Sequence, residues 1–295
     1  MAVLGVLGVP GGLAVRARTS LAMTRIAGGN EDMGLNELQD IALTDKGTTA
    51  DLALISSRLA RRDFDKALKS IDALERKQPD KPQAPTLRAS TLLAKKDFAA
   101  SRKSFERAVA LDPAYFPAVA GLAGLDLLDK KPEDARQRFQ ALLTLKPTDP
   151  QALLALAELR EQTGANKAEV IELITRAVTA NPSEIQPRLM LVDRHLRNQD
   201  VKLAAAAAQN AVTAIPDSPE LLDLLGRSQQ ATGDTNQALT TFGKLVAIQP
   251  ESVMPLMRLA GSQLAAGNKD GATTSLRKAV ALKADLLEAQ GGLIT

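Results

Sequence analysis

The sequence has no cysteine and no tryptophan, and its 295 residues include one histidine, His195, and one tyrosine, Tyr115. Without cysteine the chain can form no disulfide, thiolate zinc site or thiol nucleophile. One histidine cannot supply a metal site that needs two or three imidazoles. So few aromatic residues leave no stacking platform for single-stranded nucleic acid. These absences argue against most catalytic, metal-binding and nucleic-acid-binding classes of protein.

The charges are nearly balanced, because 37 Lys and Arg minus 34 Asp and Glu gives +3. This balance gives no reason to expect nucleic acid as a partner. No stretch approaches the 18 or more apolar residues of a membrane span. Glycine-rich segments 28–34 and 267–271 lack the spacing of a phosphate-binding loop, so we expect turns there. Because no other catalytic motif is present, the sequence predicts no enzyme activity, no cofactor and no metal.

Alanine and leucine dominate the apolar residues, which favours helices, and prolines recur every 34 or 35 residues. A ladder of small residues and a shorter ladder of phenylalanines follow the same period. Coinciding ladders indicate internal structural repeats. The prolines are Pro79, Pro113, Pro147, Pro182, Pro216 and Pro250, the small residues are Ala67, Ser101, Ala135, Ala204, Ala238 and Ala272, and the phenylalanines are Phe105, Phe139 and Phe242.

The interval 219–252 shows what one repeat should form. Leucines at helical spacing predict a first helix, in which Gly226 allows a neighbouring helix to approach closely. Gly233 suits the left-handed position at a helix end, and Asp234 or Thr235 can cap the next helix. A second helix then runs through Phe242, and the recurring proline ends it. Each repeat is therefore predicted to be a helix–turn–helix hairpin.

A 34-residue hairpin with these small, aromatic and proline positions resembles the tetratricopeptide repeat. The resemblance implies an all-α, right-handed superhelical solenoid of stacked hairpins, in which neighbouring repeats complete each other's core. The chain departs from the family where tryptophan is favoured at the fourth position and tyrosine at the eleventh. The fourth positions hold Val119, Leu153, Leu222 and Leu256, the eleventh hold Leu92, Arg160, His195, Gln229 and Gln263, and the small eighth positions hold Ala89, Ala123, Ala157, Gly226 and Ala260.

The length alone would suggest two domains, but the period predicts a single solenoid over residues 1–295. A divergent repeat precedes seven regular ones. The predicted repeats are 15–47 (divergent), 48–81, 82–115, 116–149, 150–184, 185–218, 219–252 and 253–286.

The two ends of the chain are less regular. Residues 1–14 form a poorly defined start, and 287–295 are expected to begin a further first helix. The apolar stretch 1–15 has no preceding Lys or Arg and is interrupted at Pro10, unlike a secretory signal. We expect it to be the remainder of a helix from an upstream repeat. Since a solenoid end normally needs a polar capping helix, we expect the chain to be the middle of a longer array.

His195 is the one histidine that could act as a ligand or a base, with Asp193 close to it in sequence. Residues two apart on a helix point to different sides. We therefore predict that His195 packs against the partner helix of its hairpin.

The concave face is the predicted binding surface. In the family, ligand contacts come from first-helix positions two, five, nine, twelve and thirteen. In three central repeats these positions form a mixed polar patch, whereas flanking repeats supply more apolar residues such as Met254 and Met257. A helix or an extended peptide would suit this division. The predicted partner-binding residues are Gln151, Glu158, Glu161, Gln162, Gln186, Asp193, Arg197, Glu220, Asp223, Arg227 and Gln230.

Some family members hold a C-terminal carboxylate with Lys at position five and Asn at position nine. No repeat of this chain has that pair, as 223/227 and 257/261 illustrate with Asp/Arg and Met/Gly. An adaptor for chaperone tails is therefore not expected.

Segments 61–82, 104–139 and 233–250 resemble the tetratricopeptide lipoproteins of the bacterial PEP-CTERM/exosortase system, associated with exopolysaccharide gene clusters. The resemblance implies a non-enzymatic cell-envelope or periplasmic scaffold that binds a protein or peptide segment in sorting or polysaccharide export. The lipidated cysteine and secretion signal of such a protein are not found in this sequence, so the location stays undecided. The alternative is the repeat arm of a larger enzyme, for example a glycosyltransferase, whose catalytic domain lies outside this sequence.

Overall fold

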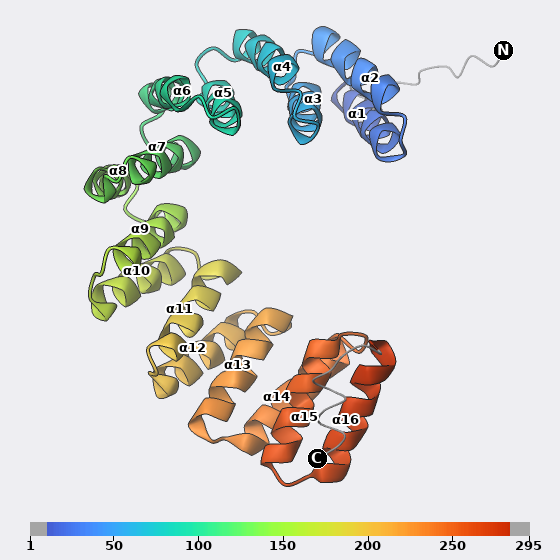
Figure 1. The fold of residues 1–295 in the computed structure, drawn as a ribbon, viewed down its shortest axis with the longest axis vertical. Helices are drawn as coiled ribbons and strands as arrows, with labels where there is room; N and C mark the ends of the chain where they lie inside the picture. Colours follow the sequence, from blue (N-terminus) through green and yellow to red (C-terminus); the bar gives the residue numbers. More distant parts are fainter. Residues whose placement is uncertain (1–10, 284–295) are drawn as a thin grey trace, which may run out of the picture. The chain divides into compact units, whose positions relative to one another are not determined.

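The computed structural model describes residues 11–283, and all regular structure within them is helical. Sixteen α-helices follow one another in this part of the chain, and no strand occurs in it. The predicted all-α class is confirmed. The helices form two compact units, one ending at Pro147 and the other beginning at Thr148, and Figure 1 labels the helices of both. The predicted extra helix at 287–295 lies outside the described residues.

The first unit contains eight helices. The first of them begins at Gly11, within the apolar stretch that we expected to be left over from an upstream repeat. The helices are α1 (Gly11–Ala27), α2 (Glu31–Thr44), α3 (Thr49–Ala60), α4 (Phe64–Lys77), α5 (Gln83–Ala94), α6 (Phe98–Leu111), α7 (Phe116–Leu128) and α8 (Pro132–Leu145).

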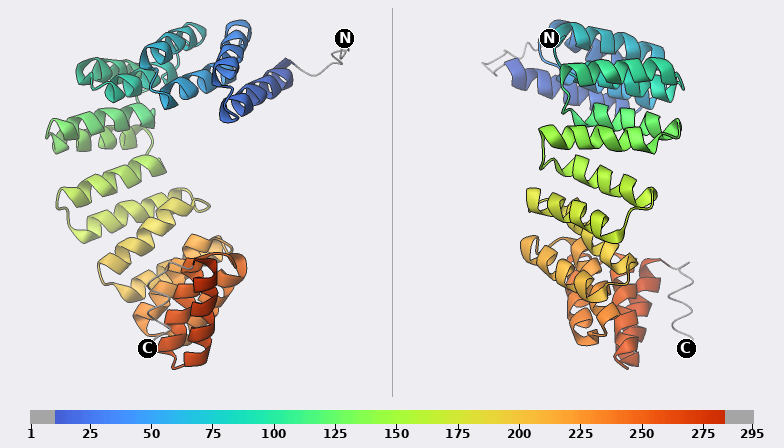
Figure 2. Two further views of the ribbon diagram at one scale, coloured as in Figure 1. Left: turned by 45° about the vertical axis from the view of Figure 1, so that its right-hand side comes forward. Right: turned by 90° about the vertical axis from the view of Figure 1, so that its left-hand side faces the viewer.

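The second unit also contains eight helices within the described residues. They are α9 (Pro150–Gln162), α10 (Lys167–Ala180), α11 (Ile185–Arg197), α12 (Val201–Ala214), α13 (Pro219–Thr232), α14 (Thr235–Ile248), α15 (Val253–Ala265) and α16 (Lys269–Leu282). Consecutive helices pack as hairpins, α13 with α14 and α15 with α16 for example, and Figure 2 shows these pairs side by side. Each hairpin from α3 to α16 falls within one of the repeat intervals given above, whereas α1 begins before the divergent interval 15–47.

The turn inside each described hairpin contains the fifteenth residue of the repeat, and this residue adopts a left-handed backbone conformation. At Gly233, φ is 83°; its N–H donates to the carbonyl of Gln230 at 3.1 Å, and the N–H of Asp234 donates to Gln229 at 2.8 Å. These two bonds form the Schellman motif that ends a helix. The eight residues at this position are Gly29, Arg62, Lys96, Lys130, Gly164, Gln199, Gly233 and Gly267.

The prediction that Asp234 caps the following helix holds only for its position. Asp234 is the N-cap residue of α14, but its side chain makes no hydrogen bond to the helix backbone. Its carboxylate instead accepts a hydrogen bond from the Thr232 hydroxyl at 2.6 Å. The side chain is drawn back across the turn, so it is not available to the N–H groups of α14.

Aromatic rings pack closely against glycine in two hairpin contacts. Phe242 is completely buried, and a Cβ added to Gly226 would lie 2.5 Å from its ring. In the first unit, a Cβ on Gly121 would lie 2.3 Å from the ring of Phe105. A real Cβ could not occupy either place without a shift of the ring. The expected close approach at Gly226 is thus confirmed.

Polar side chains occupy the eleventh position in several hairpins and bond to the residue twelve positions later, on the second helix. Gln229 accepts from the Thr241 hydroxyl at 2.8 Å, and Gln263 accepts from Ser275 at 2.8 Å. Asp126, which is 2% exposed, accepts from Arg138. The further pairs of this kind are Arg25 with Glu37 and Arg58 with Ser70. These within-hairpin bonds stand where the family favours a tyrosine.

His195, also at an eleventh position, makes no bond of this kind. It is buried, as predicted, but the residue twelve positions later is Ala207, which offers no hydrogen-bonding side chain. Its Nδ1 lies 3.9 Å from a carboxylate oxygen of Asp200 and has no hydrogen-bond partner among the described residues. Burial lowers the pKa of His195, and the nearby Asp200 opposes this only in part. His195 therefore packs as a neutral core side chain.

Candidate functional site

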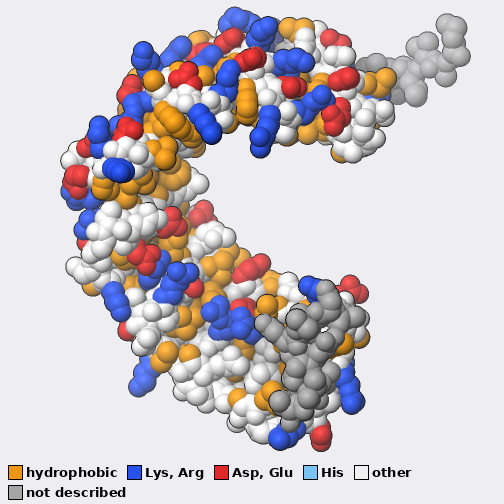
Figure 3. Space-filling view, in the orientation of Figure 1, with side chains coloured by type: hydrophobic (Ala, Val, Ile, Leu, Met, Phe, Trp, Pro, Cys, Tyr) orange, Lys and Arg blue, Asp and Glu red, His pale blue; other side chains and the backbone are white. Residues whose placement is uncertain are grey.

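The predicted partner-binding residues all lie on three first helices of the second unit. Helix α9 carries the first four, α11 carries Gln186, Asp193 and Arg197, and α13 carries the remainder. All of them are exposed or partly exposed. Figure 3 shows positive and negative side chains interspersed over this unit, with hydrophobic side chains between them.

A cavity of about 400 Å³ lies in the second unit, and α11, α13, the end of α14 and the start of α15 contribute to it. We call it the α13–α15 groove. It brings together three of the predicted residues, and none of the others lines it. It also includes Met254, a residue expected to belong to the apolar flank. The lining residues are Leu189, Pro219, Glu220, Asp223, Leu224, Arg227, Leu245, Gln249, Ser252, Met254 and Pro255.

Asp223 is the electrostatic centre of the α13–α15 groove. One of its carboxylate oxygens accepts a hydrogen bond from Nε of Arg258 at 3.0 Å, and the other lies 3.8 Å from Arg227. Glu220 accepts a hydrogen bond from the hydroxyl of Ser218 at 2.8 Å. The groove thus has charges of both signs, and Arg227, with a 37% exposed side chain, is its more accessible cation.

Several predicted contact residues also join neighbouring hairpins. The amide nitrogen of Gln230 on α13 donates to the hydroxyl of Ser262 on α15 at 2.8 Å. Glu161 on α9 forms an ion pair with Arg194 on α11. Part of the surface predicted to meet a ligand therefore stabilises the stacking of the repeats.

Arg194 and Arg258 were missed by reasoning from family positions. They lie at the tenth and sixth positions of their repeats, outside the positions used for ligand contacts. Each stands 33 to 35 residues after an acid, Glu161 or Asp223. Opposite charges separated by about one repeat are the signal that could have revealed both pairs, because such residues meet across stacked hairpins.

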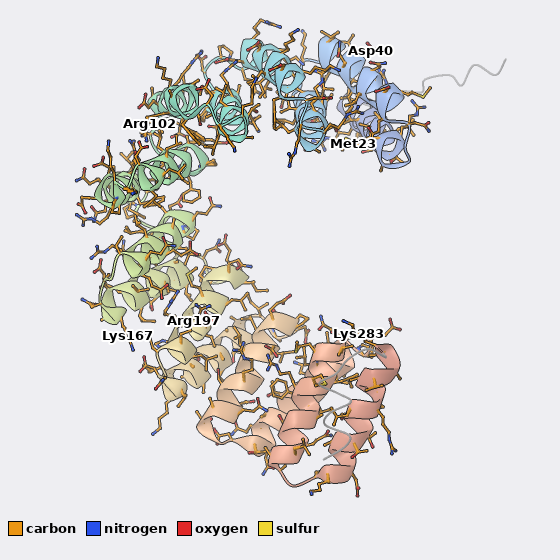
Figure 4. The ribbon with its side chains drawn as sticks, viewed as in Figure 1. Met23, Asp40, Arg102, Lys167, Arg197 and Lys283 are labelled. Atoms are coloured by element: carbon orange, nitrogen blue, oxygen red, sulfur yellow. The ribbon has the colours of Figure 1, made fainter. Side chains whose placement is uncertain are left out.

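Burial disfavours the charged form of Arg194 on α11. Burial lowers the pKa of Arg194, the positive charge of Arg197 lowers it further, and Glu158 opposes both effects. Arg197, labelled in Figure 4, pairs with Asp193 one turn earlier at 2.7 Å. Asp193 therefore forms its ion pair within α11. No hydrogen bond or ion pair between Asp193 and His195 occurs among the described residues.

The described residues bring no three His, Asp or Glu side chains together in an arrangement that could hold a metal ion. Over the same residues, no helix has the length and apolar character needed to cross a membrane.

Comparison with curated proteins gives a relative that is named for a cellulose synthase operon. The chain is 30% identical over 107 residues to cellulose synthase operon protein C of Pseudomonas fluorescens (strain SBW25). The match covers 36% of this chain and 8% of that protein. The chain thus corresponds to a small part of the relative's length.

Solved structures show the same fold at low sequence identity. The C-terminal part of a TPR repeat-containing protein from Cytophaga hutchinsonii superposes with a TM-score of 0.60 and 15% identity, covering 81% of this chain and 98% of that one. YrrB, described as a TPR protein with an unusual peptide-binding site, has a TM-score of 0.52 and 18% identity, covering 66% of this chain and 100% of its own.

Family models complete the comparison. Three tetratricopeptide repeat models match residues 52–116, 92–159 and 220–252. The matched segments include helices from both units, and their hairpins have the turns, glycine contacts and small-residue positions described above. Tetratricopeptide repeats are therefore shown for residues 52–159 and 220–252, and the described residues share the helical solenoid fold of such proteins.

Proposed function

We propose that this chain is a non-enzymatic scaffold that binds a peptide or protein segment along the first helices of its second unit. The observation that supports this most directly is the α13–α15 groove, where Glu220, Asp223 and Arg227 line one cavity together with Met254. Polar groups that fix orientation beside apolar walls are typical of ligand-binding clefts.

The groove suits an extended segment with one apolar side chain. Leu189, Leu224 and Met254 provide apolar contacts, and Met254 is 58% exposed, so an incoming side chain would remove it from water. Arg227 is placed to bind a carbonyl or a carboxylate of the same segment, because Asp223 already shares its charge with Arg258. Methionine adapts its shape to varied partners.

The known relatives support the setting of this proposal. YrrB shares the fold and is described as binding peptide, and the match to cellulose synthase operon protein C favours an exopolysaccharide system. Together with the resemblance to PEP-CTERM-system repeats, this match supports our proposal that the scaffold serves bacterial polysaccharide export or protein sorting at the cell envelope.

Photo-crosslinking tests the groove. A benzoylphenylalanine at Met254 should crosslink to one defined segment of a partner in envelope extract, and the same group at Lys202, exposed on α12, should not. A synthetic copy of that segment should bind the wild-type chain and bind Arg227→Glu about tenfold more weakly, a loss of about 1.4 kcal/mol. Lys202→Glu, with the same change in charge, should bind it like the wild type.

Two results would overturn this assignment. One is equal crosslinking from Met254 and Lys202, which would show that the groove has no preference for the segment. The other is equal affinity of the peptide for the wild type and for Arg227→Glu.

A further inference from the structure

A second cavity, of about 380 Å³, lies in the first unit between α2, α3 and α4. We call it the α2–α4 pocket; Figure 1 labels these three helices. None of the predicted partner-binding residues belongs to it. Its distinguishing feature is positive charge: Arg58 from α3 and Lys66, Lys69 and Arg76 from α4 all line it.

The basic residues of α4 share one face of the helix. Lys66, Lys69 and Arg76 follow at steps of three and seven, which places them on one side over about 15 Å of helix. The acids of α4 pair elsewhere. Asp72 and Glu75 hold Arg88 of α5 at 2.6 and 2.8 Å. Asp65 holds Lys95 at 2.6 Å and has a weaker charge interaction with Lys69. Within residues 11–283, the three basic side chains form no ion pair with the chain's own carboxylates.

Arg58 adds a partly buried guanidinium that also has no carboxylate. Its acceptors among the described residues are uncharged: Oε1 of Gln39 at 2.6 Å, the backbone carbonyl of Lys66 at 3.1 Å and the hydroxyl of Ser70. Burial lowers the pKa of Arg58, against the opposing effect of Asp63. Buried charge is stabilised by an opposite charge; Asp63 acts on Arg58 through its charge, but no carboxylate of the described residues forms an ion pair with it.

The one carboxylate among the residues lining this pocket does not neutralise it. Asp51 is buried and is bound by the ammonium of Lys77 at 2.6 Å. Lys77 also donates to the carbonyl of Ala42 at 2.5 Å, so this pair belongs to the packing of α3, α4 and the end of α2. The remaining lining charges are all positive.

Apolar groups complete the pocket. Leu54 is buried in its wall, and Leu43 is 72% exposed at the end of α2. So large an exposed aliphatic side chain beside a cationic cavity offers a contact that a bare inorganic anion would not use.

We infer that the α2–α4 pocket binds an acidic peptide segment, whose carboxylates meet Lys66, Lys69 and Arg76 and whose apolar side chain contacts Leu43. The cations extend over about 15 Å, which matches four or five residues of extended chain at about 3.3 Å each and exceeds the reach of a single phosphate. No aromatic residue lines the pocket, so the stacking expected of nucleic acid binding has no platform. This site is separate from the α13–α15 groove, and either one can fail alone.

Fluorescence anisotropy with a labelled eight-residue peptide of six acidic residues and two leucines tests the inference on the whole chain. A matched peptide with glutamine and asparagine for the acids should bind at least about tenfold more weakly. Lys69→Glu/Arg76→Glu should also bind the acidic peptide about tenfold more weakly, or about 1.4 kcal/mol. The control Lys103→Glu/Lys278→Glu changes the net charge equally at exposed sites on α6 and α16 and should change binding less than about twofold.

The role of Leu43 gives the second arm of the experiment. Leu43→Asn should weaken binding of the leucine-containing peptide but not of an all-acidic peptide of the same charge. The inference is overturned if the control double variant loses as much affinity as the pocket variant, or if the wild type does not bind. It is also overturned if polyglutamate, a polyuronate or single-stranded DNA binds as tightly as the acidic leucine peptide.

Discussion

The two units build the same hairpin from different residues at the fifteenth position. In the first unit three of the four left-handed positions hold Arg62, Lys96 and Lys130, whereas in the second unit three of four hold glycine. A side chain in the left-handed region is strained, and glycine is not. The backbone hydrogen bonds of the Schellman motif are nevertheless the same in both units. The N–H of Lys131 donates to the carbonyl of Asp126 at 2.8 Å, and the N–H of Asp234 donates to the carbonyl of Gln229 at 2.8 Å. The backbone pattern therefore outweighs the local preference of the residue.

A second difference concerns the bonds made by the residue at the eleventh position of each hairpin. The first unit uses charged groups: Asp126 accepts hydrogen bonds from Arg138 and, at 2.6 Å, from Arg102, which Figure 4 labels on α6. In the second unit, two hairpins use neutral pairs, Gln229 with Thr241 and Gln263 with Ser275, and a third uses the ion pair of Arg160 with Glu169. Both arrangements join the two helices of a hairpin, but only the charged one depends on ionisation. The α7–α8 and α13–α14 hairpins should therefore respond differently to acid and to substitutions at these positions.

The largest expected effect is common to both units. Phe242→Ala should destabilise the second unit by about 3–5 kcal/mol, because it removes a fully buried ring and leaves a cavity. Phe105→Ala should do the same in the first unit. Hydrogen exchange followed by mass spectrometry, which reports each helix separately, should show the loss of protection mainly in the unit that carries the substitution. Equal loss in both units for either variant would contradict the division into two compact units.

The next effect separates charged from neutral hairpin bonds. Asp126→Asn should cost about 1.5–3 kcal/mol, the range for hydrogen bonds to charged groups, whereas Thr241→Val should cost about 0.5–1.5 kcal/mol, the range for neutral ones. Local opening free energies from hydrogen exchange in α7–α8 and α13–α14 provide the measurement. If Thr241→Val proves as costly as Asp126→Asn, the proposed difference between these two hairpins is wrong.

Acidification should act in the same direction with a smaller effect, because a protonated Asp126 can still form hydrogen bonds. Burial by itself would raise the pKa of Asp126, but the hydrogen bonds and charges of Arg138 and Arg102 outweigh it and lower that pKa. The stabilisation is therefore present above the ordinary Asp pKa of about 3.9 and is lost as the pH falls through the lower folded value.

Hydrogen exchange as a function of pH can isolate this contribution. Between about pH 5 and pH 2, protection of α7–α8 should fall more in the wild type than in Asp126→Asn, after correction for the intrinsic exchange rate. Other carboxylates in both units titrate as well, so the difference between the two chains is the informative quantity. An identical fall in both would rule out Asp126 as the source.

The smallest effect concerns the turns. Lys130→Gly should stabilise the first unit by about 0.5–1 kcal/mol, because glycine relieves the left-handed strain but loses more conformational freedom on folding. The reverse change, Gly233→Lys, should destabilise the second unit by a similar amount. Thermal or denaturant unfolding would measure both. Stabilisation by Gly233→Lys would show that the fifteenth residue is not strained as described.

Much of the fold could be predicted from the residues, and less of the candidate site. The proline and small-residue ladders predicted all-helical hairpins, and Gly226, Phe242 and Gly233 occupy the places expected of them. Single family positions predicted the site residues one by one. They could not show that Gln230 and Glu161 bond to neighbouring repeats, since that depends on which side chains stacking brings within reach. The predicted partner-binding role of these residues stays a prediction.

Sequence by itself determined the period, the hairpin and the buried stripe, because these follow from helical spacing and from residues such as proline and glycine with strong backbone preferences. Only the tertiary structure decided where charge and apolar surface meet. Packing of α2 and α3 on α4 gathers Arg58 with Lys66, Lys69 and Arg76, and α13 beside α15 places Asp223 against Arg258. Those contacts join residues 8 to 35 positions apart, and their energies depend on distances that arise only when the helices pack.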